Sequence, residues 1–106
     1  MDTRALAFPK ARATVLERIE RKRELKATED RCRRAVRVRD QGRCRVPSCQ
    51  ASSKHLHHIV YRSHGGKWQT HNVVSLCQKC HGLVHAALIR IAGDADGVLT
   101  FEGVKE

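Results

Sequence analysis

The fold is decided by residues 44–85, which read CRVPSCQASSKHLHHIVYRSHGGKWQTHNVVSLCQKCHGLVH. Two cysteine pairs enclose this stretch: Cys44 and Cys49 have four residues between them, and Cys77 and Cys80 have two. Structural zinc sites commonly take four thiolates that arrive as two closely spaced pairs. The spacing therefore predicts one closed zinc site that clamps the ends of the segment between the pairs. Such a site has no open coordination position, so we expect it to stabilise the fold and not to catalyse.

Composition points to one small, basic domain. The chain has 106 residues, a formal net charge of +10 and only 4% aromatic residues. A chain of this length buries a limited core, so we expect the metal to substitute for a larger one. Residues 28–50 carry seven Lys or Arg against three Asp or Glu, whereas residues 51–106 carry six against four. This charge favours a polyanionic partner, and we expect DNA, bound mainly through its phosphates.

The cysteines also indicate a compartment. The first residues, Met1 to Arg4, lack the apolar run of a secretory signal, and no stretch approaches the roughly 20 apolar residues of a membrane span. We therefore expect a cytoplasmic protein with no membrane partner and with reduced thiols, so that two disulfides are the weaker alternative to a metal. Cys32, the fifth cysteine, is expected to be a small buried residue on a helix face.

Hydrophobic spacing predicts a small α+β fold whose first part is helical. Residues 1–27 are interpreted as a basic N-terminal arm followed by a solvated helix, with a dedicated DNA-binding helix as the weaker alternative. Thr28 is followed by two acids, as an N-cap often is, which predicts a second helix that ends near Gly42. This interpretation divides the chain into the basic segment 1–27 and a main domain over 28–106.

The remainder of the chain predicts two strands, a helix and a hairpin. Runs of apolar and β-branched residues bounded by Gly and polar residues are typical of strands, and apolar residues three and four apart are typical of a helix. In chain order, the predicted elements are a strand over 54–61, a strand over 73–76, a helix over 78–87 and a β-hairpin over 88–101.

Several arginines are candidates for contact with DNA. The second predicted helix would present four of them outward, and contacts to phosphates would set affinity and salt dependence without reading sequence. Arg62 lies just past the first predicted strand and is a further candidate, for the scissile phosphate, with an ordinary solvated arginine as the equal alternative. The four helix residues are Arg31, Arg34, Arg37 and Arg39.

The histidines predict a second metal site, an open one. His81 and His85 are i,i+4 on the predicted helix and so share one face, while His57 and His58 lie on the preceding strand. A strand and a following helix that pack together can converge their side chains on one ion and leave positions for water and a phosphate oxygen. Adjacent residues of a regular strand point to opposite faces. We therefore expect one strand histidine as ligand and the other as base, or a twisted or bulged strand.

Taken together, these residues resemble the HNH endonuclease family, in the branch that carries four cysteines. The resemblance implies a small α+β domain with a zinc-stapled treble-clef ββα-metal (His-Me finger) motif, preceded by basic helices and followed by a β-hairpin. It covers roughly residues 37–90. The motifs that carry it are His57-His58-Ile59-Val60, Gly65-Gly66, His71-Asn72-Val73, Leu76-Cys77-Gln78-Lys79-Cys80-His81 and His85.

The resemblance also implies a role for each histidine. His57 occupies the position of the first metal ligand, His81 that of the final ligand, and His85 that of a further ligand. His58 occupies the position of the general base, and Asn72 supports the base and its loop. The expected reaction is hydrolysis of DNA phosphodiester bonds with a divalent ion, Mg²⁺, Mn²⁺, Ni²⁺ or Zn²⁺. Imidazole ligands are unusual for magnesium.

Two other functions stay open. A non-catalytic zinc-finger module of the same fold would bind DNA without cleaving it, although it would need none of His58, Asn72 and His81. A structural or interaction protein would use its metal only to stay folded and would not show salt-dependent DNA binding. A single domain with one active site would nick one strand, and double-strand cleavage would require a dimer or two events.

Overall fold

The computed structural model describes residues 13–103, and within them it has two helices and two antiparallel hairpins. This confirms the predicted small α+β class. Neither described helix is long and apolar enough to cross a membrane. In chain order the elements are α2 (Val15–Asp40), β1 (His55–His58), the short 3-10 turns η1 (Arg62–His64) and η2 (Thr70–Asn72), β2 (Val73–Leu76), α3 (Gln78–His85), β3 (Arg90–Gly93) and β4 (Leu99–Glu102).

The helix α2 is uninterrupted over 26 residues, so the predicted helix start at Thr28 is wrong. Its true start is a capping box, in which the Glu17 amide donates to the Thr14 hydroxyl (3.1 Å) and the Thr14 amide donates to the Glu17 carboxylate (2.8 Å). Across the expected break, Lys26 and Asp30 form an i,i+4 ion pair at 3.0 Å. The acidic residues after Thr28 therefore stabilise the interior of one helix and do not mark the start of another. The division of the chain at residue 27 stays a prediction, although α2 runs across it.

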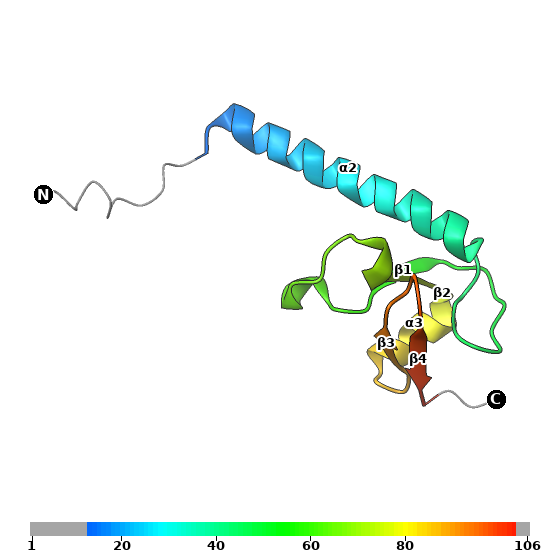
Figure 1. Cartoon of the computed structure of the whole chain (residues 1–106). Coiled ribbons are helices and arrows are strands. Elements are labelled where there is room, and N and C mark those ends of the chain that lie inside the picture. The colour runs from blue at the N-terminus through cyan, green and yellow to red at the C-terminus, as the bar shows by residue number, and fades with distance from the viewer. Residues whose placement is uncertain (1–12, 104–106) are drawn as a thin grey trace, which may run out of the picture.

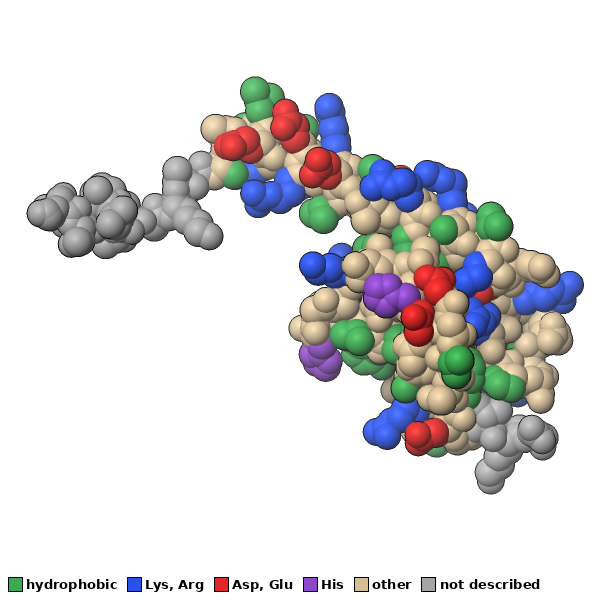
Figure 2. Space-filling view, viewed as in Figure 1, with side chains coloured by type: hydrophobic (Ala, Val, Ile, Leu, Met, Phe, Trp, Pro, Cys, Tyr) green, Lys and Arg blue, Asp and Glu red, His purple; other side chains and the backbone are tan. Residues whose placement is uncertain are grey.

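Within residues 13–103, only the C-terminal half of α2 packs against other elements (Figure 1). There Cys32 and Val36 are buried with Val73 of β2, which confirms the expectation for the fifth cysteine. The N-terminal half projects outward, and its Leu16 and Leu25 side chains are 70% and 64% exposed. Figure 2 shows acidic and basic side chains interspersed along this projecting part.

The two-stranded ribbon β1–β2 separates two clusters of apolar side chains. The strands pair antiparallel, with His58 opposite Val73 and His57 opposite Val74. Val73 packs against α2, whereas Val74 packs into the larger cluster around α3. Because side chains alternate across a strand, the two faces of β1 look toward different helices.

The larger apolar cluster joins α3, the loop after α2 that carries Cys44 and Cys49, and the β3–β4 hairpin. The hairpin begins two residues later than predicted because the amides of Leu88 and Ile89 donate to the Leu83 carbonyl of α3, at 2.9 and 3.3 Å. These bonds extend the C-terminal turn of the helix. The buried members of the cluster are Cys44, Val46, Val74, Leu76, Cys77, Cys80, Val84, Ile89, Ile91 and Ala95.

A buried carboxylate ties α2 to β2 and to the hairpin. Asp40 accepts hydrogen bonds from Arg39 (2.7 Å), Arg45 (2.8 Å) and the Ser75 amide (3.2 Å). Burial alone would raise the pKa of Asp40, but these three donors outweigh it and lower the pKa. Arg39 also bonds Asp96, in the turn between β3 and β4, at 2.9 Å. Arg39 therefore faces inward, and the expectation that it points outward is wrong.

Candidate functional site

The four paired cysteines converge on one point. Cys44 and Cys49 lie on the turn after α2, Cys77 caps the start of α3, and Cys80 lies in the first turn of that helix. Their sulfur atoms all lie within 4.8 Å of one another, and the sulfurs of Cys49 and Cys77 are 3.8 Å apart. Two thiolates bound tetrahedrally to one zinc at about 2.3 Å lie about 3.8 Å from each other. Each of the five cysteines is free, so the four are placed as donors to one ion.

The environment of these thiols also suits a cation. Burial opposes ionisation of Cys77, but the Cys80 amide donates to its sulfur (3.3 Å) and the neighbouring thiols donate as well, which together lower its pKa to about 7. Burial raises the pKa of Cys44 and of Cys80. A metal ion would supply the positive charge that draws such buried thiols into the thiolate form.

Three histidines form a second cluster, on the face of β1 that looks toward α3. His57 comes from β1, and His81 and His85 come from successive turns of α3, as their i,i+4 spacing predicts. One ring nitrogen of each lies within 4.8 Å of the other two. The Nε2 atoms of His81 and His85 are 2.9 Å apart, a separation that suits either a shared hydrogen bond or a shared cation.

The environment of the cluster favours the neutral form of His57 and His81. His57 is only 5% exposed, and burial, followed by His81, His85 and His58, lowers its pKa to about 4. Burial and His85 also lower the pKa of His81. A neutral imidazole keeps the lone pair that binds a metal ion, so the donor set and its electrostatics fit a divalent cation.

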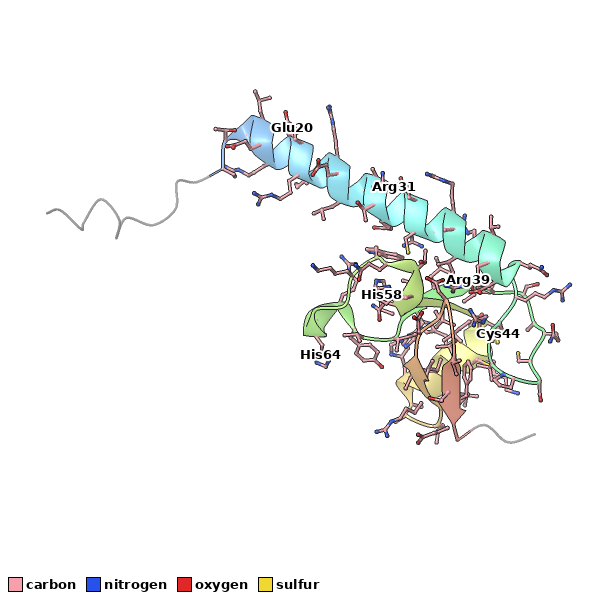
Figure 3. The ribbon with its side chains drawn as sticks, viewed as in Figure 1. Glu20, Arg31, Arg39, Cys44, His58 and His64 are labelled. Carbon is pink, nitrogen blue, oxygen red and sulfur yellow. The ribbon has the colours of Figure 1, made fainter. Side chains whose placement is uncertain are left out.

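His58 lies on the other face of β1, beneath α2 (Figure 3). Its ring meets the Trp68 ring edge-on, with the centroids 4.4 Å apart. Burial, with Arg62 and Arg33 nearby, lowers the pKa of His58, and its buried Nε2 has no hydrogen-bond partner among residues 13–103. The structure does not bring His58 into the cluster of His57. The strand is regular at this point, so the two histidines diverge as its alternation requires.

Asn72 fixes the loop that follows β1. Its side-chain oxygen accepts from the Val60 amide (2.8 Å), and its amide nitrogen donates to the carbonyls of Val60 (3.1 Å) and Lys67 (3.3 Å). These bonds replace strand pairing for Val60, which is why β1 ends at His58 and not at residue 61 as predicted. The buried Asn72 side chain thereby sets where the loop leaves the strand.

A family model for HNH endonucleases matches residues 30–87, more than half of the chain. The chain belongs to the HNH endonuclease family. Comparisons with curated proteins and with solved structures gave no match. The matched residues of this HNH chain include the four-cysteine cluster, the three-histidine cluster, His58 and Asn72. The projecting half of α2 and the β3–β4 hairpin lie outside them.

The remaining candidates for DNA contact lie on two parts of the HNH chain. Arg31, Arg34 and Arg37 are exposed on α2, as expected. Arg62, at the start of η1, is exposed too, and its guanidinium lies 6.0 Å from the centre of the Trp68 ring. Arg62 therefore lies near the face of β1 that carries His58, whereas the three arginines of α2 point to solvent.

Three aromatic residues near the HNH site were missed from the sequence. The His55 ring lies 4.5 Å from that of His81, because His55 and His57 are two apart on β1 and share a face. That i,i+2 spacing was a usable signal. Tyr61, beside His57, and Trp68, over His58, come from the irregular loop, where no periodicity marks them.

Proposed function

We propose that this chain is a metal-dependent HNH endonuclease that hydrolyses DNA phosphodiester bonds. The observation that carries the proposal is the convergence of His57, His81 and His85 from neighbouring elements, next to a separate cluster of four cysteines. Two clusters with different donor atoms suit two ions with different roles, a structural ion and a catalytic ion. The order β1, β2, α3, with cysteines at the turn after α2 and at the start of α3, supports a treble-clef ββα-metal fold.

The cysteine cluster is proposed as a structural zinc site. Four sulfur donors complete a tetrahedral zinc and leave no position for substrate. The site links the turn after α2 to the first residues of α3, and it lies inside the larger apolar cluster. A reducing, cytoplasmic compartment, which would keep these thiols available to the metal, is part of the proposal.

The three histidines are proposed to hold the catalytic ion. Such an ion would supply stabilisation of negative charge on the phosphate and on the departing 3′-oxygen. Imidazole donors favour Zn²⁺, Ni²⁺ or Mn²⁺ over Mg²⁺. The low pKa of His57 keeps this ligand neutral at pH 7, and α3 fixes the spacing of His81 and His85.

His58 is proposed as the general base. Its lowered pKa keeps it neutral, so it can accept a proton from the attacking water. In an in-line displacement the attacking oxygen and the leaving oxygen lie on opposite sides of phosphorus. A phosphate bound at the end of the β1–β2 ribbon would have the base on the side of one face of β1 and the ion site on the side of the other face. That arrangement suits an in-line displacement. Asn72 is proposed to hold the loop there.

The proposal assigns DNA binding to the exposed basic residues. Arg31, Arg34, Arg37 and Arg62 are proposed to contact phosphates, and the chain's formal net charge of +10 favours such contacts. Each phosphate contact should contribute about −0.9 to the slope of log affinity against log salt. The slope therefore measures how many of these arginines bind.

A nicking assay on supercoiled plasmid tests the function. Wild type, His81→Ala, His58→Ala and the control His71→Ala are compared with Mg²⁺, Mn²⁺, Ni²⁺ and Zn²⁺. His71 is exposed and belongs to neither metal-ligand cluster, so its variant should cleave normally. His81→Ala should lose ion-dependent cleavage, and His58→Ala should lose about 10²- to 10⁴-fold, as expected for a general base. Equal cleavage by His58→Ala would remove His58 from the mechanism.

One observation favours a second function, a non-catalytic DNA-binding module. His58 is 8% exposed and covered by Trp68, so a substrate reaches it only after a side chain moves. Salt-dependent DNA binding without cleavage by any of the four ions would favour this module over the endonuclease.

A further inference from the structure

A groove opens beside the histidine cluster, between η1 and the β3–β4 hairpin. Its volume is about 950 Å³. His57 lies at the inner end, Tyr61 and His64 come from the loop that carries η1, and Arg90 comes from β3. The hairpin side of the groove lies outside the residues that match the family model.

The groove lining carries the rings of His57, Tyr61 and His64, and the Tyr61 ring also lies beside His85 of the histidine cluster. The Tyr61 ring lies near-parallel to that of His85, at 28° with the centroids 6.2 Å apart, and near-parallel to that of His64, at 21° and 6.0 Å. It also meets His57 edge-on at 5.6 Å. The Tyr61 side chain is 40% exposed although it sits among these rings. The row of rings therefore presents an accessible aromatic surface that begins at the candidate ion site.

We propose that this groove binds unpaired nucleobases next to the scissile phosphate, with Tyr61 as their stacking partner, so that the substrate is single-stranded or locally unpaired DNA. The inference rests on the proposed endonuclease function. Proteins that bind single strands stack bases on aromatic side chains, which accept any base because every base has a π-face. In a duplex those faces are covered by neighbouring base pairs, and a base must first leave the stack.

The lining of the groove suits a nucleotide strand. Ile59, Val84 and Leu88 provide apolar surface for the flat faces of bases, and Arg90 provides a cation for a phosphate. Glu102 is the single acidic residue in the described lining of the groove. The formal net charge of the chain, +10, also favours a strand that carries phosphates. The groove is also continuous with the ion site through His57, so a strand held by its phosphate at the ion would place its next base beside Tyr61.

Binding of a labelled oligonucleotide tests the inference without relying on cleavage. The metal-loaded full chain is titrated, with no further ion added, into a 12-nucleotide single strand carrying 2-aminopurine and into the same strand in a duplex. Tyr61 is the only tyrosine of the chain, so its variants report on this ring alone. We expect the single strand to bind at least about tenfold more tightly than the duplex and to show quenched 2-aminopurine fluorescence, as stacking requires.

The variants separate stacking from other effects. Tyr61→Ala should weaken single-strand binding by about 5- to 150-fold, the range for loss of one base–aromatic stack, and Tyr61→Phe should retain it. Val98→Ala is the control, because Val98 is exposed on the hairpin turn and outside the groove lining. Circular dichroism checks that each variant is folded, and His64→Ala provides a second, smaller loss if Tyr61→Ala fails to fold.

The outcomes also distinguish this inference from the function on which it rests. Equal single-strand affinity of wild type and Tyr61→Ala, or equal affinity of wild type for single strand and duplex, would overturn the inference while leaving plasmid cleavage possible. Tyr61-dependent binding of the single strand without cleavage by any ion would support the groove as a base-binding site and overturn the endonuclease.

Discussion

Replacing Asp40 by Asn removes a buried charge and keeps the size of the side chain. The Asp40 side chain is 1% exposed and is paired with Arg39 at 2.7 Å and with Arg45 at 2.8 Å. The side chains of the two arginines are only 21% and 25% exposed. Asp40→Asn would therefore leave two half-buried guanidinium groups without their shared carboxylate, and it would turn an amide NH₂ toward them.

The structure sets the size of the expected loss. Removing one partner of a buried ion pair costs about 3–5 kcal/mol. Asp96 still pairs with Arg39 at 2.9 Å, so we expect the lower end, about 3 kcal/mol. Domains of this size have a free energy of unfolding of about 5–15 kcal/mol, and 1 kcal/mol shifts Tm by about 4–8 °C. Asp40→Asn should therefore lower Tm by more than about 10 °C.

Urea and thermal unfolding of the metal-loaded protein, followed by circular dichroism, measure this loss. The matched control is Asp30→Asn, the same change on the same helix, where the side chain is 40% exposed and pairs with Lys26. An exposed i,i+4 pair contributes only about 0.3–0.5 kcal/mol. A loss for Asp40→Asn no larger than that for Asp30→Asn would refute the view that the buried carboxylate holds α2 to the rest of the domain.

Three further predictions concern pH, the loop and the metal. The pKa of Asp40 is lowered on folding, so the stabilisation that its carboxylate provides is present above about pH 4 and is lost as pH falls through the folded pKa. The difference in urea midpoint between wild type and Asp40→Asn should therefore shrink from pH 7 to pH 3. An unchanged difference would contradict the linkage. Asn72→Ala loses three hydrogen bonds and should lower the free energy of unfolding by about 2–3 kcal/mol. Hydrogen exchange of the Val60 amide should become faster. Unchanged exchange would show that Asn72 does not hold the loop. Cys80→Ser should lose bound zinc, measured by elemental analysis, whereas Cys32→Ser, at a buried cysteine outside the cluster, should keep it; equal zinc contents would contradict the assignment.

The sequence predicted that the four paired cysteines would lie together and that His57, His81 and His85 would lie together, because these signals are local. The spacing of Cys77 and Cys80 places both at the start of one helix, and the i,i+4 spacing of His81 and His85 places both on one face. The family resemblance is confirmed by the match over residues 30–87. The roles of His58 and Asn72 stay predictions.

The error at Arg39 came from an interaction that no local pattern contains, and the error at Thr28 came from a local pattern with two interpretations. Arg39 looks like any outward arginine of a helix, but its partner Asp96 lies 57 residues further along the chain. Thr28 and the acids after it match a helix start, yet ion pairs within one continuous helix use the same residues. Tyr61 was expected at the end of the predicted strand over 54–61, whereas it lies in the irregular loop after β1.

The brevity of α3 has a consequence for the order in which the protein matures. The helix has eight residues, with Gly82 in its middle, and a helix of this length is not stable in water by itself. Cys80 and His81 are adjacent on it, so an ion at the four cysteines anchors the same turn that positions the histidines. On the proposed assignment, we therefore expect the sulfur site to fill before the imidazoles hold their own ion. Metal supply would then decide how many newly made chains become competent.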